Sequence, residues 1–104
     1  MTRDQFLAKQ MGVEWHDTWS PKTSNPDYTK DPADILALQQ WVMDDTQHKD
    51  FSWDDFCDWA FARWRKTEPS GIIFHNRFNR WLFSDPDRFA DLVAEFRGWR
   101  NEAI

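Results

Sequence analysis

The sequence predicts a mainly α-helical protein that forms an irregular bundle of about five short helices. Three observations predict it: apolar residues recur at helical spacing in several segments, residues typical of helix N-caps precede them, and the connections after residue 45 are short. The 104 residues match the commonest size of one domain, so we treat residues 1–104 as a single domain. An α+β alternative, with a small sheet near 13–15 and 71–74, stays open because both segments also suit short strands.

The first helix is predicted at 2–11, where Thr2 is suited to the N-cap and Gln5 follows at capping-box spacing. Gly12 then provides the left-handed residue with which many helices end. Residues 13–30 contain two prolines and several turn formers, which predicts a long connection without regular structure. Three aromatic residues are expected to anchor this connection to the core: Trp15, Trp19 and Tyr28.

A second helix is predicted to begin at Asp31-Pro32 and to end near Asp44. Asp31 is suited to the N-cap, and proline is favoured at the first helical position. The side chains expected to face the core are Ile35, Leu38 and Val42, widened by Leu36 and Met43. Trp41 falls outside this apolar side.

A third helix is predicted from Ser52 to about Lys66, because Asp55 stands three residues after Ser52, as in a capping box. Apolar residues at steps of three and four are expected to face the core: Trp53, Phe56, Cys57, Ala60 and Trp64. The acidic residues of this helix are expected to face water. Basic residues near its end suit the negative end of the helix dipole.

Two further helices are predicted in the last third of the chain. The fourth, at about 75–83, follows the helical spacing of Phe78, Trp81 and Leu82. The fifth, at 86–100, begins at Asp85-Pro86, which repeats the start of the second helix. Its core-facing residues are expected to be Phe89, Leu92, Val93, Phe96 and Trp99.

The composition predicts an aromatic core. The chain has eight Trp, nine Phe and one Tyr, but only 12 residues of Ile, Leu and Val together. Each aromatic side chain buries ~150–250 Å², so a few of them fill much of a small interior. An alternative is that some Trp side chains lie outside the core for a partner, because Trp is enriched at binding hot spots.

The chain carries one cysteine, Cys57, so neither an intramolecular disulfide nor a cysteine-based zinc site is expected. Its first residues lack the apolar segment of a signal peptide. No apolar run approaches the ~18 residues that span a bilayer. These features predict a cytoplasmic protein without a membrane partner.

The residue patterns do not support an enzyme or a metal centre, and we expect neither a catalytic site nor a cofactor. The acidic segment that could bind a metal ion with His48 comprises Asp44, Asp45, Asp50, Asp54, Asp55 and Asp58. It lacks the glycine and the terminal glutamate of an EF-hand, and such runs are usually hydrated helix faces. Cys57 lies on an apolar helix side, with nothing nearby to lower its pKa. An uncharacterised enzyme is therefore the third function that we consider.

Charge is distributed unevenly along the chain. Residues 1–60 carry a net charge of −7 and residues 61–104 carry +2, which together give −5. A net acidic chain argues against a general nucleic-acid-binding protein. Five basic residues nevertheless lie in two successive predicted helices: Arg63, Arg65, Lys66, Arg77 and Arg80. Nucleic-acid binding through this group is the second function that we consider.

Protein–protein interaction is the function that ranks first. Trp41 and Trp59 lie off the apolar sides of their helices, and an apolar patch with an acidic rim is typical of an interaction site. The expected contact residues are Trp41, Asp54, Asp55, Asp58 and Trp59. Self-association through them is one form of this interpretation.

Two parts of the sequence resemble small uncharacterised proteins of bacteriophages and prophages. They are Met-Gly-Val-Glu-Trp-His at 11–16 with Asn-Pro-Asp-Tyr at 25–28 and Asp31-Pro32, and the segment 84–96. Some of those proteins carry cysteine pairs that this chain lacks, so no zinc knuckle is implied. The resemblance implies an accessory protein of the bacterial cytoplasm that binds a host protein during infection. An acidic face would then compete for a basic groove.

Overall fold

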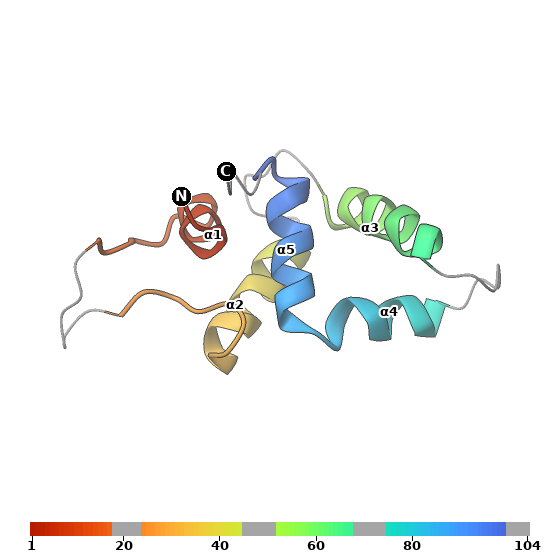
Figure 1. The fold of residues 1–104 in the computed structure, drawn as a ribbon, viewed down its shortest axis with the longest axis horizontal. Coiled ribbons are helices and arrows are strands. Elements are labelled where there is room, and N and C mark those ends of the chain that lie inside the picture. Colours follow the sequence, from red (N-terminus) through yellow and green to blue (C-terminus); the bar gives the residue numbers. More distant parts are fainter. Residues whose placement is uncertain (18–23, 45–51, 68–74, 100–104) are drawn as a thin grey trace.

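Five α-helices make up the regular structure of the residues that the computed structural model describes, which are 1–17, 24–44, 52–67 and 75–99. The helices are α1 (Arg3–Gln10), α2 (Pro32–Met43), α3 (Trp53–Thr67), α4 (His75–Phe83) and α5 (Pro86–Phe96) (Figure 1). The predicted mainly α-helical class is confirmed. The described residues contain no strand, so a strand at 13–15 is wrong, and 71–74 lies outside them. None of the described helices is long and apolar enough to cross a membrane.

The helices begin where the sequence predicts them because the expected N-caps form. The Asp31 carboxylate accepts a hydrogen bond from the Ala33 backbone N–H at 2.9 Å. At α3 the exchange is reciprocal, since Ser52 Oγ accepts from the Asp55 N–H and the Asp55 carboxylate accepts from the Ser52 N–H. Side chains also cap α1 and α5, at Thr2 and Asp85. Each cap stabilises its helix by ~1 kcal/mol.

α5 ends at Phe96 rather than at the predicted residue 100, because Gly98 turns the chain away from the helix axis. Gly98 has a φ of 103°, a left-handed conformation that costs little only for glycine. The Trp99 N–H donates to the Ala94 carbonyl at 2.8 Å and the Gly98 N–H donates to the Glu95 carbonyl at 3.0 Å. This pair of bonds is a Schellman motif, which closes the helix.

α5 lies at the centre of the molecule and packs against each of the other four helices (Figure 1). Five of its side chains are buried: Phe89, Ala90, Leu92, Val93 and Ala94. Successive residues of a helix point about 100° apart, so buried neighbours such as Leu92, Val93 and Ala94 cover more than one side. α5 is therefore enclosed by the other helices, with a polar strip left at Asp87, Asp91 and Glu95.

The core is aromatic where α3 and α4 meet α5. The Phe56 ring packs edge-on against Phe89, with centroids 6.0 Å apart, and against Phe96, with centroids 5.6 Å apart. Phe83 stacks on Phe89 at 5.6 Å, so its position off the apolar side of α4 brings it onto α5. Such ring pairs contribute about 0.5–1.5 kcal/mol each beyond the burial of their area. The predicted aromatic core is confirmed on this side.

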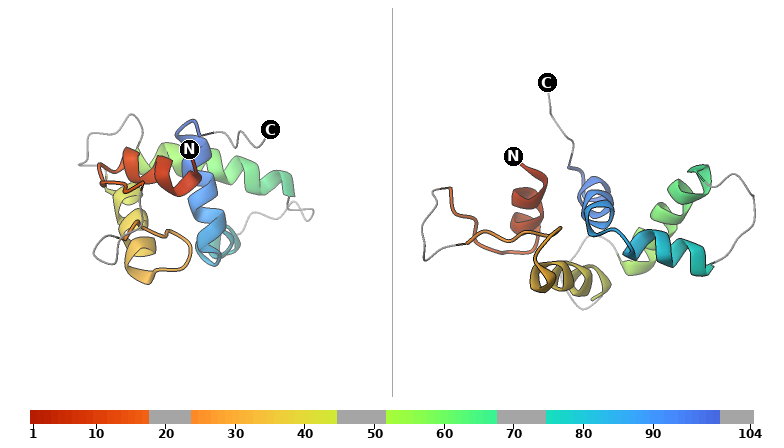
Figure 2. Two further views of the ribbon diagram at one scale, coloured as in Figure 1. Left: turned by 60° about the vertical axis from the view of Figure 1, so that its left-hand side comes forward. Right: turned by 60° about the horizontal axis from the view of Figure 1, so that its bottom comes forward.

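The core contributed by α1 and α2 consists of smaller side chains: Leu7, Ala8, Leu38 and Val42. Leu38 and Val42 follow the predicted apolar side of α2. Leu36 and Met43, which were expected to widen that side, are exposed, so this part of the prediction is wrong. The reason is that the buried side of α2 is narrow, because α2 packs on α5 and no other described helix lies on its opposite side (Figure 2).

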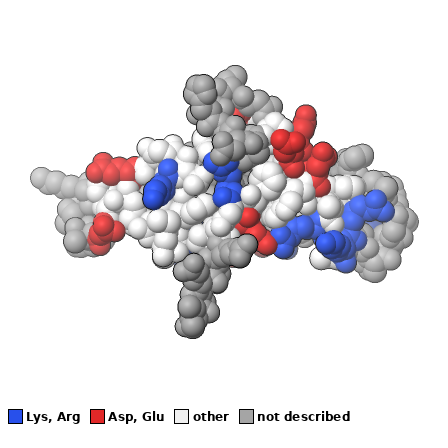
Figure 3. Space-filling model, turned by 90° about the horizontal axis from the view of Figure 1, so that it is seen from above, with Lys and Arg blue, Asp and Glu red and all other residues white. Residues whose placement is uncertain are grey.

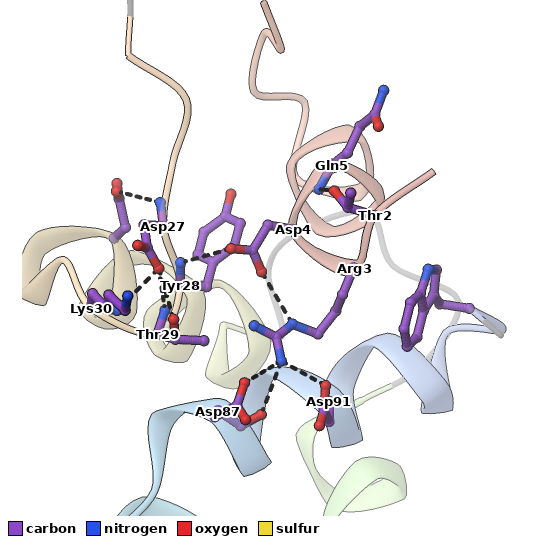
Figure 4. Close-up of polar contacts among 12 residues, drawn as sticks. Thr2, Arg3, Asp4, Gln5, Asp27, Tyr28, Thr29, Lys30, Asp87 and Asp91 are labelled. Carbon is purple, nitrogen blue, oxygen red and sulfur yellow. Dashed lines mark hydrogen bonds and ion pairs between the residues drawn. The ribbon is translucent and has the colours of Figure 1, made fainter. Parts of the chain in front are cut away.

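Arg3 links α1 to α5 through carboxylates on both helices (Figure 4). Its Nη1 lies 2.5 Å from an Asp87 oxygen and 2.6 Å from an Asp91 oxygen, and its Nε lies 3.1 Å from an Asp4 oxygen. Burial alone lowers the pKa of Arg3, but its hydrogen bonds to Asp91 and Asp87 outweigh that effect and raise the pKa. The guanidinium therefore stays charged and fixes the angle between two helices that lie at opposite ends of the sequence.

The described parts of the connection before α2 are held by polar side chains. Asn25 accepts a hydrogen bond from the His16 N–H at 2.7 Å and donates one to the His16 carbonyl at 2.8 Å. Tyr28 is buried, and Trp15 is half-buried against the core, so both anchor the connection as predicted. Trp19 lies outside the described residues. Burial and the nearby Asp34 and Asp4 raise the pKa of Tyr28 to about 12.

Replacing Arg3 with alanine is expected to destabilise the protein by ~1–2 kcal/mol, because it leaves Asp87 and Asp91 without their cation and unlinks α1 from α5. Urea unfolding followed by Trp fluorescence measures this change. Lys9→Ala is the matched control, since Lys9 is an exposed cation of the same helix and forms no ion pair with a described residue. Equal losses in both variants would contradict the role given to Arg3.

Candidate functional site

One side of α3 is apolar and buried, and the other side is charged and exposed. The side toward α4 and α5 is buried at Phe56, Ala60 and Trp64. The other side is exposed and charged, and we call it the outer face of α3: Asp54, Asp55, Asp58, Ala62, Arg65 and Lys66. Steps of three and four residues connect its members, so they lie on one side of the helix. The outer face of α3 is acidic in its first half and basic in its second.

Acidic and basic side chains occupy separate areas at the end of the molecule that holds α3 and α4 (Figure 3). Acidic residues in the first turn and basic residues in the last turn stabilise a helix by favourable interaction with its dipole. The helix dipole therefore accounts for Asp54 and Asp55, which lie in the first turn of α3. It does not account for Asp58, which lies beyond the first turn.

Two aspartates of the outer face of α3 are exposed and form no ion pair with a described residue, namely Asp54 and Asp58. Asp55 caps the helix, as described above. The acidic residues of α5 differ: Arg3 contacts Asp87 and Asp91, and Arg63 contacts Glu95 at 2.6 Å. The carboxylates of α5 thus hold the fold together, whereas Asp54 and Asp58 are available to an external cation.

Trp59 lies beside the outer face of α3 and is half-buried. Its ring packs on Phe96, with centroids 5.2 Å apart. The Arg63 guanidinium lies over the Trp59 ring at 4.7 Å from its centroid and also donates to Glu95. Trp41, the other expected tryptophan, belongs to α2 and is half-buried as well. Both rings are partly buried against the core, so each offers a partner only part of its surface.

The expected basic group comes from two helices. Arg65 and Lys66 are exposed near the end of α3, and Arg77 and Arg80 are exposed on α4. The end of α3 and the start of α4 lie at the same end of the molecule (Figure 1). Arg63 is already engaged by Trp59 and Glu95. All five cations of the group are therefore exposed, but Arg63 also has partners within the domain.

Trp64 and Trp81 belong to the same two helices as the basic group, and both pack against other residues of the domain. Trp64 is buried, with its ring 5.9 Å from that of Phe78. Trp81 is half-buried, stacks on Phe78, and has the Arg88 guanidinium 5.1 Å from its ring centroid. Single-stranded nucleic acid is usually bound by stacking on exposed rings beside cations. Neither Trp64 nor Trp81 is such an exposed ring.

Cys57 is half-buried on α3, between Asp54 and Asp58 in the sequence. Burial and the charges of these two aspartates raise the pKa of its thiol to about 11. A nucleophilic cysteine needs the opposite shift. The described residues also contain no group of three or more His, Cys, Asp or Glu placed to hold a metal ion. Asp45, His48 and Asp50, which belong to the acidic segment of the sequence, lie outside the described residues.

Comparisons with protein families, with curated proteins and with solved structures found no match to this chain. Helical spacing in the sequence predicts that the acidic residues of α3 face water, as Asp54, Asp55 and Asp58 do. The contact of Arg63 with Glu95 could not be predicted, because the two residues lie 32 positions apart along the chain.

The thiol of Cys57 is expected to react slowly with iodoacetamide near pH 8, at a rate at least about tenfold below that of the unfolded chain. With its pKa raised to about 11, the folded protein holds less thiolate than a cysteine at the ordinary value of 9.0. The rate should rise steadily between pH 9 and 11, as mass spectrometry of timed samples measures. A plateau already reached by pH 8 would contradict the raised pKa.

Proposed function

We propose that the protein is a small accessory protein that acts by binding another protein through the outer face of α3. The observation that supports it most is that Asp54 and Asp58 are exposed without an ion pair to a described residue, while the carboxylates of α5 are paired. A fixed helix presents both groups four residues apart, so they project in similar directions. This surface suits a protein partner that carries basic residues.

The expected partner is a host protein with a basic groove. The carboxylates of Asp54 and Asp58, held on one helix, resemble the spaced negative charges that such a groove binds. The resemblance of the sequence to bacteriophage proteins favours a bacterial host protein, and modulation or inhibition is the expected consequence. Trp59 adds a half-buried ring beside the charges, and Trp41 would join the contact only for a partner that also reaches α2.

Nucleic-acid binding is the second candidate, and one observation favours it. Arg65, Lys66 and Arg80 are exposed and form no ion pair with a described residue. Cations at the junction of two helices can neutralise phosphates, and such binding weakens steeply with salt. The protein interaction ranks first because the rings near these cations are packed in the core.

The proposal is tested by affinity capture from a bacterial host lysate, with and without nuclease, read by quantitative mass spectrometry. The wild-type protein is expected to retain a host protein in both conditions. The double variant Asp54→Asn/Asp58→Asn is expected to retain it at least about tenfold less, because charge complementarity is lost. Both substitutions are at exposed positions and leave the Ser52–Asp55 cap intact.

The matched control is Glu14→Gln/Asp17→Asn, which removes the same charge from two other exposed acidic residues without an ion pair to a described residue. It should capture as much partner as the wild type. Equal loss in both double variants would mean that net charge alone drives capture. Capture that disappears with nuclease, and that Arg65→Ala/Lys66→Ala abolishes, would replace this proposal with the second candidate.

A further inference from the structure

The exposed charges of α3 follow an order that is complementary to itself. The outer face of α3 begins with aspartates and ends with Arg65 and Lys66, and Ala62 lies between the two groups. None of its charged side chains forms an ion pair with a described residue. A second α3 that runs in the opposite direction would therefore place its basic end beside the acidic end of the first.

Helical geometry divides the outer face of α3 into two rows of residues along the helix, because successive residues point about 100° apart. The first row is Asp54, Asp58 and Arg65, and the second row is Asp55, Ala62 and Lys66. When a two-fold axis perpendicular to both helices relates two copies, each row meets the same row of the other copy in reverse order. The match of charges is therefore decided row by row.

Opposite charges meet in both rows if the axis lies at the level midway between Asp54 and Lys66. In the first row, Arg65 of the second copy then lies about 1.5 Å from the level of Asp54 and about 4.5 Å from that of Asp58, measured along the helix. In the second row, Lys66 of the second copy lies about 1.5 Å from the level of Asp55. Each contact occurs twice by symmetry, so every charge of the outer face of α3 meets an opposite charge.

The charges favour the antiparallel pair over a parallel one, in which aspartates would face aspartates and cations would face cations. Asp58 supports this order, because the dipole of α3 does not account for it, whereas the pair places it beside Arg65 of the second copy. The two Asp58 residues lie about 6 Å apart in level, which is farther than each lies from that arginine. Ala62, near the axis, is small enough to let the helices approach closely.

We propose that two copies of this chain pair through the outer face of α3, as an antiparallel helix pair with two-fold symmetry. Exposed ion pairs each contribute little, and the net charge of −5 on each copy opposes association. The pair therefore forms reversibly, with a dissociation constant of about 0.1–1 mM. It is populated where the protein is concentrated and dissociates on dilution.

Pairing covers the surface that we assign to a protein partner. Two copies in contact cannot bind that partner through the same aspartates, so the pair is a masked form of the protein. A partner with a basic groove displaces the second copy by mass action. This consequence rests on the function proposed above, whereas the pairing itself does not.

Sedimentation equilibrium of the purified chain tests the pairing over concentrations of about 10–1000 µM. The mass of the wild type is expected to rise from 12.6 kDa toward twice that value. Arg65→Glu should weaken association at least about tenfold, because it sets like charges against each other in the first row. Asp54→Lys/Asp58→Lys should weaken it as much for the same reason. An equimolar mixture of the two variants should associate as the wild type does, because opposite charges then meet between unlike copies.

The matched control for Arg65→Glu is Lys9→Glu, which changes the net charge equally at an exposed position of α1 and should associate as the wild type does. Equal weakening in both variants would overturn the proposal, since net charge rather than the outer face of α3 would then control association. Circular dichroism of each variant is expected to show unchanged helix content, because every substituted position is exposed.

A wild-type chain that stays monomeric over this range would also overturn the proposal, and so would a mixture of the two charge-reversed variants that fails to associate. No other protein is present in this measurement, so a failure to pair leaves the capture of a host protein unaffected. Conversely, a wild type that pairs but captures no host protein would contradict the proposed function and leave the pairing in place.

Discussion

Burial of α5 is the constraint on which the rest of the structure depends. Its side chains at Phe89, Leu92 and Val93 are buried in different directions, so no single neighbouring helix can cover it. α3 and α4 cover one part with aromatic rings, and α1 and α2 cover another with smaller side chains. The burial of these residues provides the main favourable free energy of folding, at roughly 25 cal/mol per Å² of apolar area.

The same constraint determines the surfaces. Because each helix turns its apolar side toward α5, its opposite side is free to serve another purpose. The charges of α5 are used internally, by Arg3 and Arg63. The outer face of α3 keeps charges that no described residue pairs, and α2 keeps the exposed apolar side chains of Leu36 and Met43. These are two chemically distinct surfaces on one small domain.

Local signals in the sequence predicted much of the fold. Caps are local hydrogen bonds between residues two or three apart, so Thr2, Asp31 and Asp85 could be assigned from the sequence. The end of α5 was placed too late, because periodic apolar residues continue through Trp99, while Gly98 takes a left-handed conformation that periodicity does not register. The contacts of Arg3 and Arg63 join distant segments, and no spacing rule predicts them.

The candidate surfaces were predicted only in part. The exposed aspartates of α3 follow from helical spacing, because they lie opposite an apolar side. The exposure of Leu36 and Met43 could not be deduced, since apolar residues lie on more than one side of α2 and do not show how wide a side meets the core. That side is decided by the position of α5, which is a property of the assembled fold. Similarly, Trp41 and Trp59 proved to be half-buried because neighbouring helices cover much of each ring.

Native-state hydrogen exchange by NMR tests the central role of α5 most directly. If every other helix depends on α5, the backbone amides of Val93 and Ala94 exchange only when the whole protein unfolds. Their opening free energy should then equal the free energy of unfolding measured with urea, and no amide of α3 or α4 should be more strongly protected. Amides in α3 that remain protected while those of α5 exchange rapidly would show that α3 and α4 are stable without α5, and would contradict this account.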